Sequence, residues 1–258
     1  MKNKNLLIAS IALLFLMLWL PLGQQDFLTD HWMKIGTYSV PFILIGVFLF
    51  LGKNYSLKKQ NHFRLIALLM LLAYILHQFE EHWIDLLGNH YAFYTYNNNF
   101  IRTLLSETDT SINPLSKSSV FIINTSLVWL LGFLSIWRSP KHLFPLFSMA
   151  GIIVVNAFVH IMAALVNFKY NPGLLTSILI FVPCYGLFAR YIFKKYPSYK
   201  KHIFSGLLWA FLAHVIMIGG MLAANYYNVI SELLYFIILI AWSIIPVFIF
   251  NNKTILNM

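Results

Sequence analysis

The stretch LIALLMLLAYILHQFEEHWID, residues 65–85, decides how the rest of the chain is interpreted. It begins as an apolar run of the length that crosses a bilayer, about 20 residues. It ends with two histidines and three carboxylates. A charged side chain inside a membrane is costly, and where it occurs it is usually functional. This stretch therefore predicts a membrane-spanning helix that carries a polar site.

The composition of the whole chain agrees with a membrane protein. Of its 258 residues, 60% are hydrophobic and 10% are charged, and the mean hydropathy is +0.74, unlike a soluble domain. Apolar runs of spanning length recur at about 5–22, 36–52, 64–87, 119–137, 142–168, 174–193, 203–226 and 230–250. We therefore expect an all-α, polytopic bundle of about eight transmembrane helices, which forms a single integral membrane domain over residues 1–258.

The positions of the basic residues predict the orientation. The net charge of +10 could suggest nucleic acid, but the basic residues lie in alternate loops between the predicted spans. With the N-terminus inside, 14 of the 18 Lys and Arg residues are cytoplasmic, and the other four are Lys34, Arg102, Lys117 and Lys169. The positive-inside rule therefore predicts that both termini are cytoplasmic. We expect the lipid bilayer as the partner and no nucleic acid, and the sequence names no protein partner.

One connection between the predicted spans is long. Residues 89–118 form an outer loop of Asn, Ser, Thr and aromatic residues, and its length predicts a lid or an interfacial segment. Its tyrosines also fit the aromatic belt that lies at lipid headgroups. The motif-bearing core of the domain is predicted over about residues 64–193.

Polar residues gather on one side of the third predicted span. A helix turns 100° per residue, which brings four of them into a stripe about 80° wide. They are Tyr74, His77, Glu81 and Asp85. Glu80 flanks the stripe, and His82 points away from it. The two glutamates are about 100° apart, so we expect them to differ in role.

Other predicted spans bring polar residues to a similar depth. In the fifth span, Asn156 and His160 are four residues apart and share one face. At about 1.5 Å per residue, His77, the glutamates and His160 lie roughly 20–25 Å into a core about 30 Å thick. The fourth span adds Asn124, and the seventh adds His214 nearer the middle. We expect these residues to converge in the outer half of the bilayer, beneath the long outer loop.

The glutamates need a partner that neutralises them. Every Lys and Arg can be assigned to a loop or a helix end, unless Arg102 folds back from the outer loop. The carboxylates must therefore be protonated, pair with protonated histidine or bind a metal. Imidazole with carboxylate suits zinc, with iron or manganese as alternatives, and a catalytic zinc has three protein ligands and one open position.

The predicted metal ligands are His77, His160 and a glutamate, Glu81 in this assignment, with His214 as a fourth ligand or a proton carrier. The predicted catalytic residues are Glu80, Glu81 and Asn156: one glutamate would act as general base on a metal-bound water, and Asn156 would orient a ligand or the substrate. Which glutamate binds the metal and which acts as base stays open. Four further side chains are expected to support the site from behind. They are Tyr74, His82, Asp85 and Asn124.

Two of these motifs resemble a known family. The sequences HQFEE, residues 77–81, and NAFVH, residues 156–160, resemble the HxxEE and NxxxH motifs of the HXXEE family of bacterial integral membrane proteins. The turn at residues 170–173, YNPG, is also similar to that family, and the likeness covers about residues 70–180. The resemblance implies a multi-pass protein of the bacterial cytoplasmic membrane with a shared polar site, but it implies no particular reaction.

The depth of the predicted site favours acyl chains and isoprenoids over soluble metabolites. We therefore predict a metal-dependent membrane enzyme that acts on a lipid-like or amphiphilic substrate, with hydrolysis as the favoured reaction. The same His/Glu cluster would alternatively serve as the relay of a proton- or cation-coupled transporter. A structural polar network that holds helices together is the third possibility.

Overall fold

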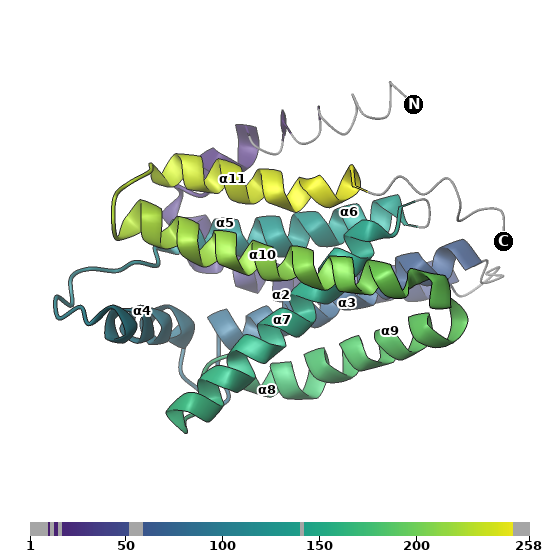
Figure 1. Cartoon of the computed structure of the whole chain (residues 1–258), viewed down its shortest axis with the longest axis horizontal. Coiled ribbons are helices and arrows are strands. Elements are labelled where there is room, and N and C mark those ends of the chain that lie inside the picture. Colours follow the sequence, from purple (N-terminus) through teal and green to yellow (C-terminus); the bar gives the residue numbers. More distant parts are fainter. Residues whose placement is uncertain (1–9, 11–12, 15–16, 52–58, 140–141, 250–258) are drawn as a thin grey trace.

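The described part of the chain is helical (Figure 1). The computed structural model describes residues 10, 13–14, 17–51, 59–139 and 142–249. These residues include no strand, and an isolated β-bridge joins Ile84 and His90. The predicted all-α class is therefore confirmed.

The elements follow one another with short connections, apart from the loops on either side of α4. They are α2 (Asp26–Leu51), α3 (Lys59–His82), α4 (Ala92–Leu105), α5 (Lys117–Asn124), η1 (Thr125–Leu130), α6 (Leu131–Arg138), α7 (Phe144–Asn167), α8 (Leu174–Thr176), η2 (Ser177–Phe181), α9 (Val182–Lys195), η3 (Pro197–Tyr199), α10 (Lys200–Asn225), α11 (Glu232–Ile244) and η4 (Ile245–Val247). The π-helical turns η1 and η2 join their neighbours into two continuous helices, Lys117–Arg138 and Leu174–Lys195.

Five helices in the described ranges are long and apolar enough to cross a membrane. They are His62–His82, Lys117–Arg138, Phe144–Asn167, Leu174–Lys195 and Pro197–Asn225. A shorter apolar helix covers Glu232–Val247. These six helices correspond to the last six of the eight predicted spans. The second predicted span, 36–52, falls largely within α2, and most of the first, 5–22, lies outside the described residues.

The third predicted span ends earlier than expected. α3 stops at His82, and Asp85 then accepts hydrogen bonds from the backbone N–H groups of Leu87 and Asn89 at 2.9 and 2.8 Å. Such side-chain bonds favour turns because they satisfy backbone donors outside a helix. Gly88 completes the turn with a φ of +82°. The predicted helical stripe is therefore wrong at Asp85, which stabilises this turn instead.

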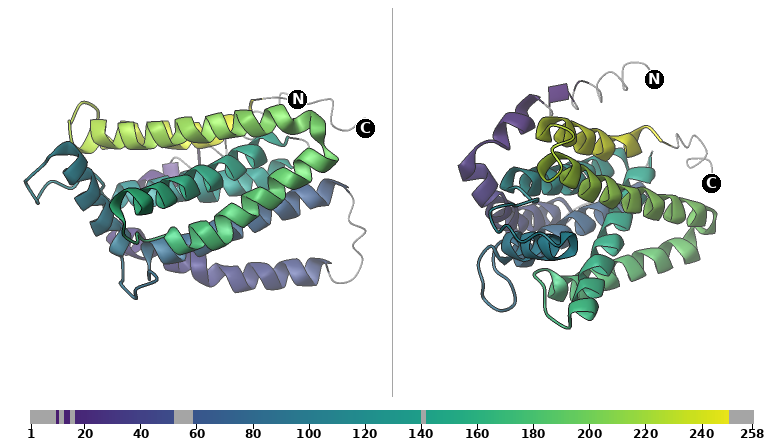
Figure 2. Two further views of the ribbon diagram at one scale, coloured as in Figure 1. Left: turned by 60° about the horizontal axis from the view of Figure 1, so that its bottom comes forward. Right: turned by 60° about the vertical axis from the view of Figure 1, so that its left-hand side comes forward.

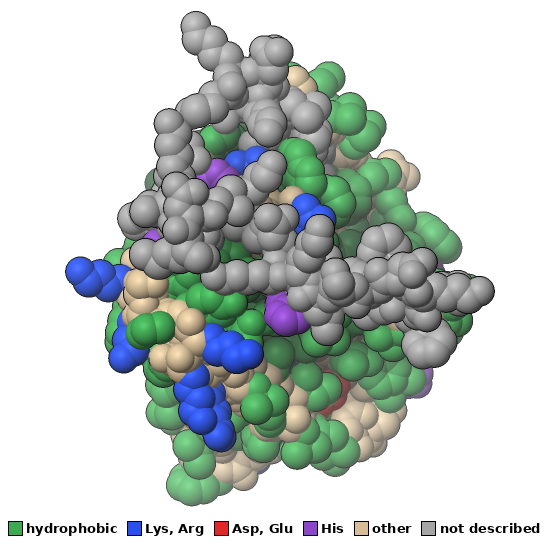
Figure 3. All heavy atoms as spheres, turned by 90° about the vertical axis from the view of Figure 1, so that its right-hand side faces the viewer, with side chains coloured by type: hydrophobic (Ala, Val, Ile, Leu, Met, Phe, Trp, Pro, Cys, Tyr) green, Lys and Arg blue, Asp and Glu red, His purple; other side chains and the backbone are tan. Residues whose placement is uncertain are grey.

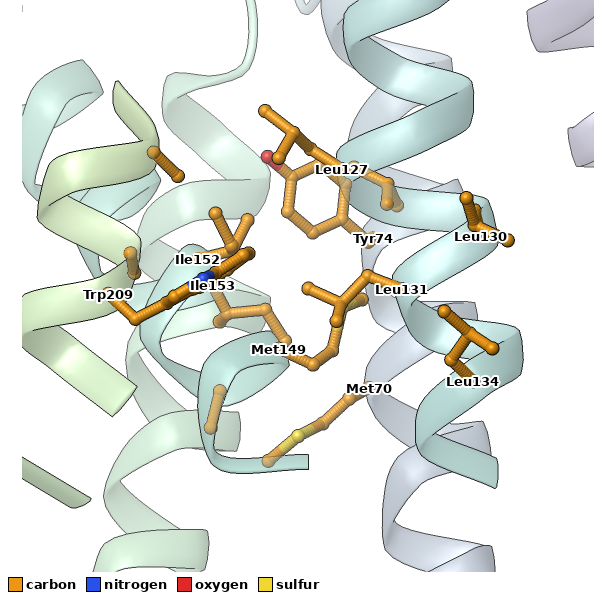
Figure 4. Close-up of a cluster of buried hydrophobic side chains, with 14 of the residues drawn as sticks. Met70, Tyr74, Leu127, Leu130, Leu131, Leu134, Met149, Ile152, Ile153 and Trp209 are labelled. Carbon is orange, nitrogen blue, oxygen red and sulfur yellow. The ribbon is translucent and has the colours of Figure 1, made fainter. Parts of the chain in front are cut away.

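α7 lies at the centre of the bundle, where it contacts α3, α6, α9 and α10. Buried side chains from several of these helices, among them Met70, Met149 and Trp209, form an apolar cluster (Figure 4). α7 and α10 cross where small residues let the backbones meet, because a Cβ on Gly151 would lie 2.5 Å from the carbonyl oxygen of Gly206. Close packing of small residues is a main source of helix association in lipid.

The two ends of the bundle differ in character. α4 lies at the end where α7 and α10 finish (Figures 1 and 2). Figure 3 shows the opposite end of the bundle, which is the right-hand side of Figure 1, and Lys and Arg side chains gather on it. The connection from α9 to α10 contributes Lys194, Lys195, Lys200 and Lys201 to this end. This is the end that the positive-inside rule assigns to the cytoplasm.

The predicted outer loop, residues 89–118, contains the helix α4. The buried Asn98 ties α4 to the chain before α5, since its Oδ1 accepts from the backbone N–H of Leu115 at 2.9 Å and its Nδ2 donates to the Leu115 carbonyl at 3.1 Å. Arg102 donates to the Thr110 carbonyl at 2.8 Å. α4 is therefore a tethered cover, and the guanidinium of Arg102 stays within this loop.

Candidate metal centre

Three buried side chains from two helices converge towards the α4 end of the bundle. α3 contributes His77 and Glu81, and α7 contributes His160. Glu81 Oε2 lies 3.4 Å from His77 Nε2, and Glu81 Oε1 lies 3.3 Å from His160 Nε2. One ligand atom from each residue lies within 4.8 Å of the other two. The prediction that the third and fifth spans bring these groups face to face is confirmed.

The contacts behind His77 fix which of its nitrogens faces the cluster. His77 Nδ1 lies 2.8 Å from Thr176 Oγ1, and that hydroxyl donates its own proton to Glu80 Oε2. Thr176 therefore accepts from His77, and Nδ1 carries the proton. The lone pair of Nε2 points towards Glu81, and this nitrogen has no hydrogen-bond partner among the described residues. Leaving a buried polar atom unpaired is costly, which marks Nε2 as a candidate ligand.

His160 is held in the same way. Asn171 Nδ2 donates to the backbone carbonyl of His160 at 2.9 Å, which orients the amide so that Oδ1 lies 2.7 Å from His160 Nδ1. Nδ1 therefore carries the proton, and Nε2 presents its lone pair to Glu81. Metal-binding histidines usually donate the other ring N–H to an oxygen in this manner, which fixes the tautomer.

The cluster lacks a Lys or Arg partner within the described ranges. Two nitrogen lone pairs and a carboxylate repel one another unless a proton or a cation lies between them. The only ion pair of a Lys or Arg side chain in this part of the chain joins Lys117 to Asp30, at 2.8 Å. Glu81 must therefore be protonated itself, pair with a protonated histidine or bind a metal.

The turn Tyr170–Gly173, between α7 and α8, closes the cluster. Gly173 has a φ of +95°, and a Cβ there would lie 2.7 Å from Cε1 of both His77 and His160. Glycine adopts this φ without strain and leaves room for the two rings. The turn therefore helps to set the distance between the imidazoles. The sequence identifies this turn as a family feature, but no periodic pattern in it links the residues of the turn to the site.

Glu80 faces the turn and not the histidines. Its carboxylate accepts from the Tyr170 hydroxyl at 2.9 Å, from the Leu175 N–H at 3.0 Å and from the Thr176 N–H at 2.7 Å, and the Thr176 hydroxyl is a fourth donor. Four donors fill the acceptor positions of a carboxylate, and the start of a helix favours negative charge. Burial raises the pKa of Tyr170, so its hydroxyl remains a donor. The two glutamates thus have different neighbours, because Glu81 alone faces the imidazoles, and that they differ in role stays a prediction.

His82 also reaches Glu81. Its Nε2 lies 2.9 Å from Glu81 Oε2 and 3.1 Å from Asn124 Nδ2. Asn124 is oriented by Gln78, which donates to Asn124 Oδ1 at 3.0 Å and accepts from the Trp129 indole at 2.9 Å. The expectation that His82 points away is wrong, since it ends α3 next to the long side chain of Glu81. Its ring also lines a separate outer cavity of about 530 Å³.

A second cavity, of about 240 Å³, adjoins the cluster. Its polar lining comes mainly from the cluster and its neighbours, namely Tyr74, Glu81, Asn97, Asn124, Asn156, His160, Asn171 and His214. The remaining lining is largely apolar and comes from α4, α5, η1, α7 and α10. The structure therefore places the cluster at the wall of a mostly apolar chamber that α4 covers.

Two predicted site residues face this chamber without joining the cluster. Asn156 Nδ2 donates to the Tyr74 hydroxyl. His214 Nδ1 donates to the Ala210 carbonyl at 2.8 Å, so its Nε2 is left as the acceptor. His214 lies outside the group of three ligand atoms formed by His77, Glu81 and His160. The structure therefore does not place His214 with the three candidate ligands, as its predicted role of fourth ligand requires.

Comparison with known proteins gives one match. Residues 68–189 match the model of a family described as "Protein of unknown function with HXXEE motif". The matched region includes both motifs, the turn between α7 and α8, and all three members of the cluster. Searches among curated proteins and among solved structures found no match. The function must therefore be argued from the site.

Proposed function

We propose that this chain, whose residues 68–189 belong to the HXXEE family, is a metal-dependent membrane enzyme. In this proposal His77, Glu81 and His160 bind a divalent transition metal. The main support is the pair of Nε2 atoms that face one carboxylate, each with its Nδ1 held by a hydrogen bond. Two imidazoles and a carboxylate suit Zn²⁺, with Fe²⁺ and Mn²⁺ as alternatives.

The residues around the cluster suit hydrolysis of a lipid-like or amphiphilic substrate. A metal held there would act as a Lewis acid and lower the pKa of a coordinated water. Three protein ligands leave one coordination position for that water or for substrate. Asn156 faces the chamber and is suited to orient a substrate carbonyl, and His214 Nε2 is suited to accept a proton.

Glu80 has a positioning role in this proposal. It would have to give up at least one of its four hydrogen bonds to accept a proton from water. Its charge is already stabilised by backbone N–H groups at the start of a helix. We therefore assign the metal ligand to Glu81 and the support of the Tyr170–Gly173 turn to Glu80.

A specific contact favours a second candidate, a proton- or cation-coupled transporter. His77, His82 and His160 all place Nε2 within 3.4 Å of Glu81, and chains of His and Glu side chains carry protons in transporters. His82 also lines the outer cavity, which extends the cluster towards that side. This candidate predicts pH-dependent flux in proteoliposomes and no stoichiometric metal.

Metal analysis of the purified protein tests the proposal. Wild type, purified without chelator, should carry close to one transition metal per chain, and His77→Ala, His160→Ala and Glu81→Gln should each lose it. His90→Ala is the control, because this histidine belongs to the outer turn and lies outside the cluster. Wild-type occupancy below about 0.2 per chain would remove the basis for a metal enzyme.

The reaction needs a separate assay. An ester-linked reporter lipid in vesicles should be hydrolysed by wild type and by His90→Ala, and not by Glu81→Gln. Proton flux without hydrolysis, and without metal, would instead support the transporter.

We also infer eight spans with both termini on the cytoplasmic side, in the cytoplasmic membrane of a bacterium. The basic connection between α9 and α10 supports this orientation. In a Cys184→Ala background, a cysteine replacing Ser111 in the outer loop should react with an impermeant maleimide on intact cells. A cysteine replacing Ser198 should react only after permeabilisation. The opposite pattern would reverse the topology.

A further inference from the structure

The chamber beside the cluster has an apolar mouth. Leu104, Val159 and Ile218 line the chamber, yet they are 67%, 45% and 46% exposed. The other side chains that line it are buried or only partly exposed. The three exposed residues come from α4, α7 and α10. The mouth therefore lies between these three helices.

The packing of α7 and α10 explains why the chamber opens there. The two helices meet at Gly151 and Gly206, about two turns after each helix begins, where a Cβ on either residue would lie 2.5 Å from a backbone oxygen of the other helix. They then diverge towards the end covered by α4 (Figure 1). Val159 is about 12 Å along α7 from this crossing, and Ile218 is about 18 Å along α10. The mouth is therefore on the open side of the crossing.

The depth of the mouth along the spanning helices determines whether it faces lipid or water. At about 1.5 Å per residue, Val159 lies roughly 12 Å before the end of α7, and Ile218 lies roughly 10 Å before the end of α10. Both helices have the length and hydropathy of membrane spans. Two other exposed side chains on these helices, Phe158 and Val215, are apolar as well. A mouth at this depth opens onto lipid chains and not onto water.

The size of the chamber indicates how an occupant fits. Its volume of about 240 Å³ is below the roughly 300–1,000 Å³ of pockets that enclose a whole small molecule. An occupant would therefore be partly enclosed, with the rest of it outside the mouth. The apolar walls suit hydrocarbon, and the polar groups are concentrated around Glu81 and His160.

We propose that the gap between α7 and α10 is a lateral portal, through which one hydrocarbon chain of a bilayer lipid enters the chamber. The chain lies against Ile152, Met217 and Met221, which line the chamber. A polar group along or at the end of this chain then lies beside Glu81 and His160. The portal itself is independent of the proposed enzyme activity, and only the identification of the lipid as substrate rests on that proposed function.

Photo-crosslinking in proteoliposomes tests the portal. The probe is phosphatidylcholine with a diazirine in one acyl chain, and labelled residues are located by mass spectrometry. Wild type should be labelled at Ile152 and Met221, which are buried and out of reach of a lipid that stays on the outer surface. Ile218→Trp should lower this internal labelling by about tenfold, equivalent to roughly 1.4 kcal/mol of binding free energy. Val159→Trp should do the same from the other side of the mouth.

The matched control is Val215→Trp. Val215 is on the same helix as Ile218 and is similarly exposed, at 50%, but it does not line the chamber. Its internal labelling should stay at the wild-type level. Absence of internal labelling in wild type, or equal labelling in the Ile218 and Val215 variants, would overturn the portal. Internal labelling that follows the protein-to-lipid ratio would also overturn it, because it would point to a second copy of the chain at the mouth.

Metal content, measured on the same samples, separates the two proposals. Internal labelling of a protein that carries no metal would leave the portal standing and refute the metal enzyme. A metal-loaded protein without internal labelling would refute the portal and leave the metal site standing. Retained metal in Ile218→Trp also shows that the variant has folded.

Discussion

Replacing Gly173 by alanine should disturb the cluster through two separate effects. The first is backbone strain, because the φ of +95° costs a residue with a Cβ about 1–2 kcal/mol. The second is a collision, because the new Cβ would lie 2.7 Å from both imidazole Cε1 atoms and 3.1 Å from His160 Nε2. Overpacking of a filled site typically costs about 1–3 kcal/mol. The sum is a loss of about 2–5 kcal/mol, together with loss of the metal.

Gly88→Ala separates the two effects. Gly88 has a similar φ, +82°, but a Cβ there would meet nothing within 4 Å. This variant should lose only the strain contribution, about 1–2 kcal/mol, and should keep its metal. The stability of both variants is measured by unfolding in mixed micelles with increasing SDS, and their metal content is measured alongside. If Gly173→Ala unfolds at the same SDS concentration as Gly88→Ala and keeps its metal, the turn does not set the spacing of the imidazoles.

Three further predictions follow from the contacts of individual side chains. Glu80→Gln should lower the free energy of unfolding of the metal-free protein by about 1.5–3 kcal/mol, since it weakens hydrogen bonds to a charged group. Glu81→Gln should lose metal, and its SDS midpoint should match that of metal-free wild type, because a bound metal itself stabilises the folded state; equal midpoints for the two metal-free variants would contradict this division. Asn171→Ala should weaken metal binding by about 10–100-fold, measured by competition with a chelator, and unchanged affinity would show that Asn171 does not hold the imidazole. The Asp109 N–H and the Tyr226 hydroxyl hold the pKa of Glu107 below its usual value. This loop contact should therefore be fully stable at pH values above the pKa of Glu107 in the unfolded chain, and it should be lost as the pH falls through the lowered pKa of Glu107 in the folded protein. Limited proteolysis of the loop at pH 7 and below pH 4 checks this direction.

The meeting of α3 and α7 could be predicted from sequence because it depends on helical periodicity. His77 and Glu81 are four residues apart, and so are Asn156 and His160, so each pair shares a helix face whatever the loops do. The depth count adds a second constraint, since a helix rises by a fixed distance per residue. Together these placed His160 opposite Glu81, where the structure has it.

The errors arose where the chain leaves the helix. Continuing the helix past His82 puts Asp85 on the polar stripe, but a carboxylate that can accept from nearby backbone N–H groups stabilises a turn there. The same helical geometry predicts that His82 points away, although the last residue of a helix is free to approach its neighbour. The parts of the site that come from the turn at residues 170–173 were missed because periodicity gives no information about loops. Its glycine and asparagine were the available signal.

The two adjacent glutamates pose an electrostatic problem that the structure solves separately for each. Glu80 has four donors, two of them from the start of a helix, so its charge is stabilised by hydrogen bonds alone. Glu81 faces His77 and His160, both of which direct an unprotonated nitrogen towards it when their Nδ1 atoms donate as the hydrogen bonds require. Glu81 is therefore the carboxylate that a bound cation would neutralise. The bonds made by Glu80 also hold the turn that carries Asn171, and Asn171 in turn orients His160. One carboxylate thus builds the surroundings in which the other can bind a metal, which gives a physical reason for two consecutive glutamates in a membrane helix.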